Sequence, residues 1–245
     1  LSRCGSTLAA RMLQNLPGCY CASEPEPFDA AVQWAARTPV SDDIKIMVLR
    51  ATAAALGRNR PSPDARFFLK LDCWHTLSLP LIRAAFPETP WLFLYRDPLE
   101  VAVSQLAMAG VHIVPGMLGA EMMGIVGGEA MPPEEYCAHV LGRICAAAAD
   151  FGPADGGLFV DYRDLLPALQ SGIPAHFGIT MDKTARAIVD DLTAISAKQP
   201  GITFVPDSAA KRAAAASAII AAVDAHARPA YQRLATFSQT TVATH

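Results

Sequence analysis

The chain begins with the segment Leu1-Ser2-Arg3-Cys4-Gly5-Ser6-Thr7, a short basic loop that runs into a predicted helix over residues 6–16. Gly5 allows the backbone to approach a ligand closely, and the two hydroxyl residues after it lie beside the free N–H groups of the first helical turn. Arg3 adds a planar guanidinium whose paired donors match the oxygens of a phosphate group. The loop lacks the first glycine and the Gly-Lys-Ser/Thr ending of a Walker A loop. It therefore predicts either an anion site or an ordinary helix start that follows a glycine turn.

A second basic loop lies much further along the chain. The apolar, aromatic run over 90–96 is typical of a strand, and it ends in Arg96-Asp97-Pro98. Asp97 is a good N-cap and Pro98 a good first residue for the helix predicted over 98–109. Arg96 is therefore expected at the carboxyl end of a strand, with Ser104 about two turns into the helix. The alternative is that Arg96 and Asp97 form only a cap and a local ion pair.

Strands and helices alternate along the chain, which determines the expected fold class. Strands are predicted over 66–72, 90–96 and 157–162. This order is typical of an α/β domain with a mostly parallel central sheet flanked by helices. Ligands bind such sheets at the carboxyl ends of the strands, where we expect the first loop, Arg96 and Tyr162. The simplest organisation of 245 residues is a single domain over 1–245.

The other elements are predicted from apolar spacing and from proline or acidic starts. Helices are expected over 28–37, 41–57, 77–86, 132–150 and 209–225, with a proline-rich acidic turn over 22–28 and a helix-rich insertion over 110–131. The rest of the C-terminal part is predicted to be helical around a loop at 198–208.

The composition excludes some classes of partner and favours others. A net charge of −3 argues against general nucleic-acid binding. No secretory signal or membrane span is evident, because the most apolar stretch, 111–128, is interrupted by Pro115, Glu121 and several glycines. Six cysteines without paired metal-type spacing are typical of reduced thiols, so we expect a cytoplasmic protein. Composition does not indicate an oligomeric state.

The start of the chain has two further features. The first residue is Leu1 and not a methionine, and the chain begins directly at the loop. We therefore expect the strand that leads into this loop to be missing from the chain. Cys4 lies in the loop beside a helix N-terminus, where a thiol can become reactive. The alternative is that Cys4 is a small neutral loop residue.

Together the two loops resemble those of the sulfotransferase superfamily, whose members use PAPS (3′-phosphoadenosine-5′-phosphosulfate). The resemblance covers about residues 1–165 and implies a P-loop-like three-layer domain. It assigns Arg96 and Ser104 to the 3′-phosphate and places Tyr162 near the nucleotide. Lys211, with Arg212, either closes over the nucleotide like the basic C-terminal loop of relatives or starts an ordinary surface helix. The resemblance assigns the 5′-phosphosulfate to Arg3, Cys4, Gly5, Ser6 and Thr7.

The resemblance also implies a base for the acceptor. Ser23-Glu24-Pro25-Glu26 is similar to the acidic segment after the first helix in bacterial trehalose sulfotransferase-like members. Glu24 is the leading candidate and Glu26 the reserve, because the second acid of those relatives falls where this chain has Pro27. Either carboxylate could accept a hydroxyl proton if partial burial raised its pKa. His75 is the rival base, and the alternatives are solvated charges for the glutamates and a structural hydrogen bond for the histidine.

The resemblance implies sulfuryl transfer from PAPS to a hydroxyl or amine of a small-molecule acceptor whose identity the sequence leaves open. Fixed N–H groups and cations would meet the charge that develops as the S–O bond breaks, so no metal is required. Lys70, on the strand face it shares with Asp72, either contacts the donor sulfate or pairs with that carboxylate. A small-molecule kinase is less favoured because the Walker lysine is missing. A non-catalytic nucleotide-binding or interaction domain of the same fold is the other alternative.

Overall fold

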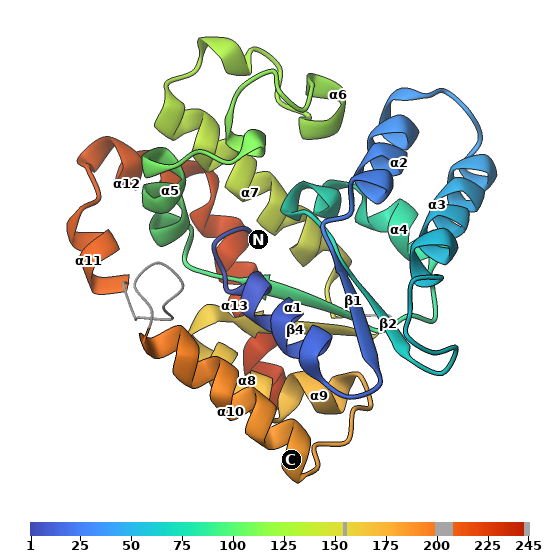
Figure 1. The fold of residues 1–245 in the computed structure, drawn as a ribbon. Coiled ribbons are helices and arrows are strands. Elements are labelled where there is room, and N and C mark those ends of the chain that lie inside the picture. Colours follow the sequence, from blue (N-terminus) through green and yellow to red (C-terminus); the bar gives the residue numbers. More distant parts are fainter. Residues whose placement is uncertain (154–155, 199–207, 243–245) are drawn as a thin grey trace.

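A computed structural model of the chain describes residues 1–153, 156–198 and 208–242. It confirms the α/β class, because strands alternate with helices over most of these residues (Figure 1). Within these ranges, no helix combines the length and the apolar character needed to cross a lipid bilayer.

The strands are short, and the helices range from one turn to five. The strands are β1 (Cys19–Ser23), β2 (Arg66–Lys70), β3 (Trp91–Tyr95) and β4 (Gly157–Asp161). The helices before β4 are α1 (Ser6–Asn15), α2 (Glu26–Arg37), α3 (Asp42–Gly57), α4 (Leu79–Ala85), α5 (Pro98–Ala107), α6 (Ala120–Met123) and α7 (Pro133–Phe151). Those after β4 are α8 (Leu165–Gln170), α9 (Gly172–His176), α10 (Lys183–Lys198), α11 (Ser208–Ala213), α12 (Ser217–His226) and α13 (Arg228–Val242).

The described strands form two parallel pairs, where the sequence predicted one mostly parallel sheet. β1 pairs with β2, with Ser23 opposite Lys70, and β3 pairs with β4, with Tyr95 opposite Asp161. Among the described residues, β2 and β3 are not joined by ladder hydrogen bonds. In both pairs the strands end at polar residues, so polar side chains gather at the carboxyl ends, where α/β proteins bind ligands.

The long helix α7 lies at the centre of the core. Its buried side chains pack against α5, α12 and α13, and α13 also contacts β4. Gly142 allows α12 to approach closely, because a Cβ at this position would lie 2.0 Å from the carbonyl oxygen of His226. Through these contacts α7 holds the C-terminal helices against the β3–β4 pair.

Local signals predicted several elements well. α5 begins at Pro98, and Asp97 caps it by accepting a hydrogen bond from the amide of Leu99 at 2.9 Å. The prediction of a turn over 22–28 is wrong at both ends, because β1 continues to Ser23 and α2 already begins at Glu26. The sequence of β1 is poor in β-branched residues, so pairing with β2 and not local propensity makes it a strand.

The C-terminal part differs from the expectation in one place. The single helix predicted over 209–225 is wrong, because α11 ends at Ala213 and α12 begins at Ser217. α11 packs on α5, whereas α12 packs chiefly on α7 and also contacts α5, so packing imposes a break that the alanine-rich sequence does not signal. Most of the loop predicted at 198–208, residues 199–207, lies outside the described residues.

Candidate functional site

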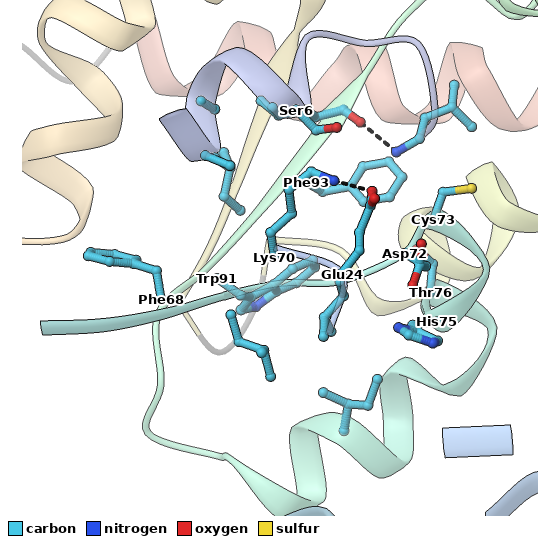
Figure 2. A pocket seen from close by; sticks show the side chains of 18 of the residues that line it. Ser6, Glu24, Phe68, Lys70, Asp72, Cys73, His75, Thr76, Trp91 and Phe93 are labelled. Atoms are coloured by element: carbon cyan, nitrogen blue, oxygen red, sulfur yellow. Dashed lines mark hydrogen bonds and ion pairs between the residues drawn. The ribbon is translucent and has the colours of Figure 1, made fainter. Parts of the chain in front are cut away.

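A cavity of about 980 Å³ is lined by the first loop, by β2 and β3 and by the segment that follows β2. Figure 2 shows Glu24 and Lys70 meeting in it, with Asp72, His75 and Thr76 close together on one side and Phe68 on the other. Its polar lining comes from distant parts of the chain: Ser2, Arg3, Ser6, Thr7, Glu24, Arg66, Lys70, Asp72, His75, Thr76, Arg83, Thr89, Gln105 and His112. The cavity therefore has a polar part near the first loop and an apolar part between β2 and β3.

The first loop enters α1 through a glycine in the left-handed conformation. Gly5 has a φ of 83° and precedes α1, so the N–H groups of the first turn are directed out of the helix. A Cβ on Gly5 would lie 2.2 Å from Leu165 Cδ2 and 3.6 Å from the ring of Tyr162. Cys4 is fully buried and its thiol donates to the carbonyl of Leu1, so it is a structural loop residue in this conformation. Arg3 is exposed and reaches the carbonyl oxygen of Met108 at 3.1 Å.

Arg96 lies behind the first loop, at the carboxyl end of β3. Only 3% of the residue is exposed, and its Nε donates to Glu100 Oε2 at 2.7 Å. Its guanidinium carbon lies 4.0 Å from the centre of the Tyr162 ring, and its Nη1 donates to the carbonyl of Arg3 at 3.4 Å. The structure thus brings together three predicted cofactor residues, Arg3, Arg96 and Tyr162. Of these, Arg96 is buried in an ion pair with Glu100.

Basic residues from the C-terminal helices reach the same region. Arg212 lies 3.0 Å from Glu100 and 3.4 Å from Asp97, so two guanidinium groups share the Glu100 carboxylate and Asp97 offsets part of their charge. Lys211 is half-buried in α11, the helix that packs against α5. Ser104 lies one turn beyond Glu100 on α5 and is half-buried. Arg96, Ser104, Tyr162 and Lys211 do not line the cavity itself.

Of the two predicted acidic bases, the cavity is lined by Glu24 and not by Glu26. Glu24 follows β1 with a φ of 49°, and its amide donates to the carbonyl of Lys70 at 2.8 Å. Its carboxylate forms an ion pair with Lys70, whose side chain is only 11% exposed. Glu26 is exposed at the first position of α2. The parallel register that places Ser23 opposite Lys70 is what creates the Glu24–Lys70 pair.

His75 is buried at the cavity wall and forms a dyad with Asp29. Its Nε2 lies 2.7 Å from Asp29 Oδ1, which also accepts from Trp74 Nε1 at 2.9 Å. Burial lowers the pKa of His75, although Asp29 opposes this. Burial alone would raise the pKa of Asp29, but the hydrogen bonds from Trp74 and His75 outweigh it and lower that pKa. The dyad is therefore a neutral imidazole oriented by an ionised carboxylate.

Asp72 lies between these two pairs. Burial, together with the nearby carboxylates of Glu24 and Asp29, raises its pKa from 3.8 to about 6. The oxygens of Asp72 and Asp29 and a ring nitrogen of His75 all lie within 4.8 Å of one another, so this group could hold a metal ion. His75 Nδ1 is buried and has no hydrogen-bond partner among the described residues.

A third polar group closes the cavity beside the first loop. Gln105 Nε2 donates to Ser2 Oγ at 2.8 Å, and that hydroxyl lies 3.3 Å from His112 Nε2. Burial, the amino group of Leu1 and Arg3 together lower the pKa of His112 to about 4, so this histidine is neutral at pH 7. It holds the loop by hydrogen bonding and not by charge.

Sequence reasoning found Glu24, Lys70, Asp72 and His75 but missed Asp29 and His112. Asp29 has the spacing of an ordinary residue in the first turn of a helix, and His112 lies in an irregular segment. Both become site residues only through tertiary packing, so no local signal identifies them.

The chain was also compared with known proteins. No model of a protein family matches it, and no curated protein matches it either.

Proposed function

We propose that the protein transfers a sulfuryl group from PAPS to a hydroxyl or amine of a small acceptor. The observation that carries the proposal is the Glu24–Lys70 pair, which lies in one cavity with the first turn of α1 and with Arg3. This arrangement combines a carboxylate that can accept a proton with cations and N–H groups suited to an anionic donor. The resemblance of the two loops to sulfotransferases supplies the choice of donor.

The donor set fits the phosphosulfate group. PAPS, when bound, supplies an activated sulfuryl group on a bridging oxygen that becomes negative as the S–O bond breaks. The first-turn N–H groups of α1 and the side chains of Ser6 and Thr7 can donate to such an oxygen. Lys70 and Arg3 offset its charge, and the low exposure of Lys70 strengthens this interaction.

Glu24 is the base in this proposal. Its carboxylate lines the cavity and is held in place by the ion pair with Lys70, so it can be positioned to accept the proton of the acceptor. Asp72 and the Asp29–His75 dyad lie on the same wall and can take that proton onward, since the pKa of Asp72 is about 6. Arg96 supports the first loop through the carbonyl of Arg3, and with Arg212 it offers guanidinium groups suited to a 3′-phosphate, whose charge Glu100 and Asp97 now offset.

A metal-dependent phosphotransferase is the second candidate. The observation that favours it is the cluster of Asp29, Asp72 and His75, whose oxygen and nitrogen atoms suit a divalent cation. Such a cation would neutralise the phosphates of a nucleoside triphosphate and would take over the role of the missing Walker lysine.

Calorimetric titration separates the candidates. The chain is titrated with adenosine 3′,5′-bisphosphate, with 5′-AMP, and with ATP in the presence and absence of Mg²⁺. Micromolar binding that requires the 3′-phosphate and is unchanged by EDTA supports the sulfotransferase, and ³⁵S-labelled PAPS with a pool of phenols, sugars and amines then tests for transfer. Binding without transfer to any acceptor in the pool indicates a non-catalytic nucleotide-binding domain. Binding of ATP only with Mg²⁺ overturns the proposal in favour of the phosphotransferase.

A further inference from the structure

Two histidines and a glutamate meet where the end of α12 crosses α7. One ligand atom from each of Glu135, His139 and His226 lies within 4.8 Å of the other two. The two imidazole rings are stacked, with their centres 3.8 Å apart and their planes inclined by 25°. None of the three residues lines the large cavity, so this cluster is separate from the site described above.

The spacing of residues along α7 and a close helix crossing explain how the cluster forms. Glu135 and His139 are four residues apart, so they lie on the same face of the helix. Gly142 continues that face, and a Cβ on it would lie 2.0 Å from the carbonyl oxygen of His226. The missing side chain therefore lets the backbone of His226 approach α7 closely enough for its ring to stack on His139. Packed helices, and not a flexible loop, hold the three residues together.

The donor set suits a transition-metal ion. Imidazole nitrogens and a carboxylate oxygen are common ligands of Zn²⁺, which binds them at about 2.0–2.2 Å. Ligand atoms within 4.8 Å of one another can converge on one such ion after small rotations of the side chains. In the described part of the chain, no hydrogen bond to a protein group occupies a nitrogen of His139 or His226. Each ring can therefore turn a nitrogen toward an ion without breaking a hydrogen bond within the protein.

The cluster borders a groove of about 410 Å³ between α7, α12 and α13. His139 and His226 line this groove, so an ion can enter from solvent and keep a water molecule as a further ligand. Arg143 and Arg233 line it as well, but both are exposed, so solvent and salt screen their repulsion of a cation. Arg233 is also paired with Asp150 at 2.7 Å. The groove thus gives a hydrated cation both access and space.

We propose that Glu135, His139 and His226 bind a Zn²⁺ ion, which ties the end of α12 to α7. The protein supplies one carboxylate oxygen and two imidazole nitrogens, and water fills the remaining position. His226 lies two residues before Arg228, whose guanidinium donates to Asp97 at 2.9 Å. Binding of the ion therefore restrains the junction between α12 and α13, from which Arg228 reaches the second basic loop. This inference does not depend on the proposed function.

Zn²⁺ binding is measured by competition with a chromophoric chelator, on the full chain and on variants that keep the circular dichroism of the parent. We expect micromolar or tighter binding, accompanied by a rise in Tm. His139→Phe and His226→Phe keep an aromatic ring for stacking but lose the ligand atom, so each should abolish both effects. Glu135→Gln should weaken binding by about 10- to 100-fold. Glu134→Gln is the matched control, because Glu134 lies in the same helical turn outside the cluster, and it should bind like the parent.

Three results would overturn the inference. The first is a parent chain that does not bind Zn²⁺, and the second is equal affinity in the parent and the two phenylalanine variants. The third is loss of binding in Asp72→Asn, which would place the ion at the cluster of Asp29, Asp72 and His75. If a phenylalanine variant does not fold, Glu135→Gln and Glu134→Gln are titrated with Co²⁺, whose visible absorption bands report its ligands. Weaker Co²⁺ binding in Glu135→Gln alone supports the inference, and equal binding by the two variants refutes it.

Discussion

The guanidinium carbon of Arg96 lies over the ring of Tyr162, 4.0 Å from its centre. The contact joins the residues that follow β3 and β4, and a Cβ on Gly5 would touch the same ring. One aromatic side chain therefore sets the distance between the first loop and the second basic loop. These loops were related in the sequence only by their resemblance to a two-part nucleotide site.

Replacement of this arginine tests its role in binding. Arg96→Ala is expected to weaken binding of adenosine 3′,5′-bisphosphate by about 1.5–3 kcal/mol, the value of a charged hydrogen bond, or about 10- to 150-fold. Calorimetry measures the affinity, and Arg96→Lys reports what charge alone retains. Arg163→Ala is the matched control, since Arg163 follows β4 but is 68% exposed. Unchanged affinity in folded Arg96→Ala removes the residue from the nucleotide site.

Substitution of each of the two glutamates after β1, Glu24 and Glu26, tests which of them is the base. Glu24→Gln is expected to lower kcat by about 10²- to 10⁴-fold, the usual contribution of a general base, and to leave nucleotide binding intact. Glu26→Gln is expected to leave both unchanged, because Glu26 is exposed and does not line the cavity. Both are followed by PAPS turnover and by calorimetry. If Glu24→Gln keeps full activity, the base is Asp72 or His75.

The raised pKa of Asp72 predicts an unusual dependence of stability on pH. The folded protein keeps a proton on Asp72 up to about pH 6, whereas the unfolded chain releases it near 3.8. The contribution of Asp72 to stability therefore falls as the pH rises from about 4 to 6 and stays low above that range. Asp72→Asn should remove this loss, so its Tm should exceed that of the parent by a margin that grows across this window. Asp64→Asn, at an exposed site, is the control, and parallel Tm curves for Asp72→Asn and the parent would contradict the assignment.

Two features favour glycine at position 5, a positive φ and a close contact for any Cβ, and Gly18 has only the first of them. Gly18 has a φ of 70° with open space around its missing Cβ, so Gly18→Ala measures backbone strain alone, at about 1–2 kcal/mol. Gly5→Ala adds a contact of 2.2 Å with Leu165 to a similar φ and should cost about 1–3 kcal/mol more. In a double-mutant cycle with Leu165→Ala, which by itself costs the stability of a buried leucine, the coupling should recover part of that excess. Chemical denaturation measures all these chains, and equal losses at Gly5 and Gly18 would show that Leu165 moves aside freely.

Features that depend on local signals could be predicted from the sequence, and features that depend on tertiary contacts could not. Asp97 and Pro98 mark the start of α5 through their own chemistry, so the position of Arg96 at a strand end followed directly. The Glu24–Lys70 pair depends on the register of β1 and β2, and β1 itself was not predicted. The partners of Arg96 other than Glu100 come from far along the chain. The sequence therefore indicated most of the candidate residues but not Asp29 or His112, while packing decided which of the candidates are paired, buried or open.

Asp97 connects the beginning of α5 to the end of the chain. Besides capping the helix, its carboxylate accepts from Arg228 on α13 at 2.9 Å and from Arg212 on α11 at 3.4 Å. During synthesis, the surroundings of Arg96 cannot be completed until residues beyond 228 have left the ribosome. The second basic loop, translated in the first half of the protein, should then be among the last parts to mature, and a nascent chain arrested before α11 should not yet retain the nucleotide.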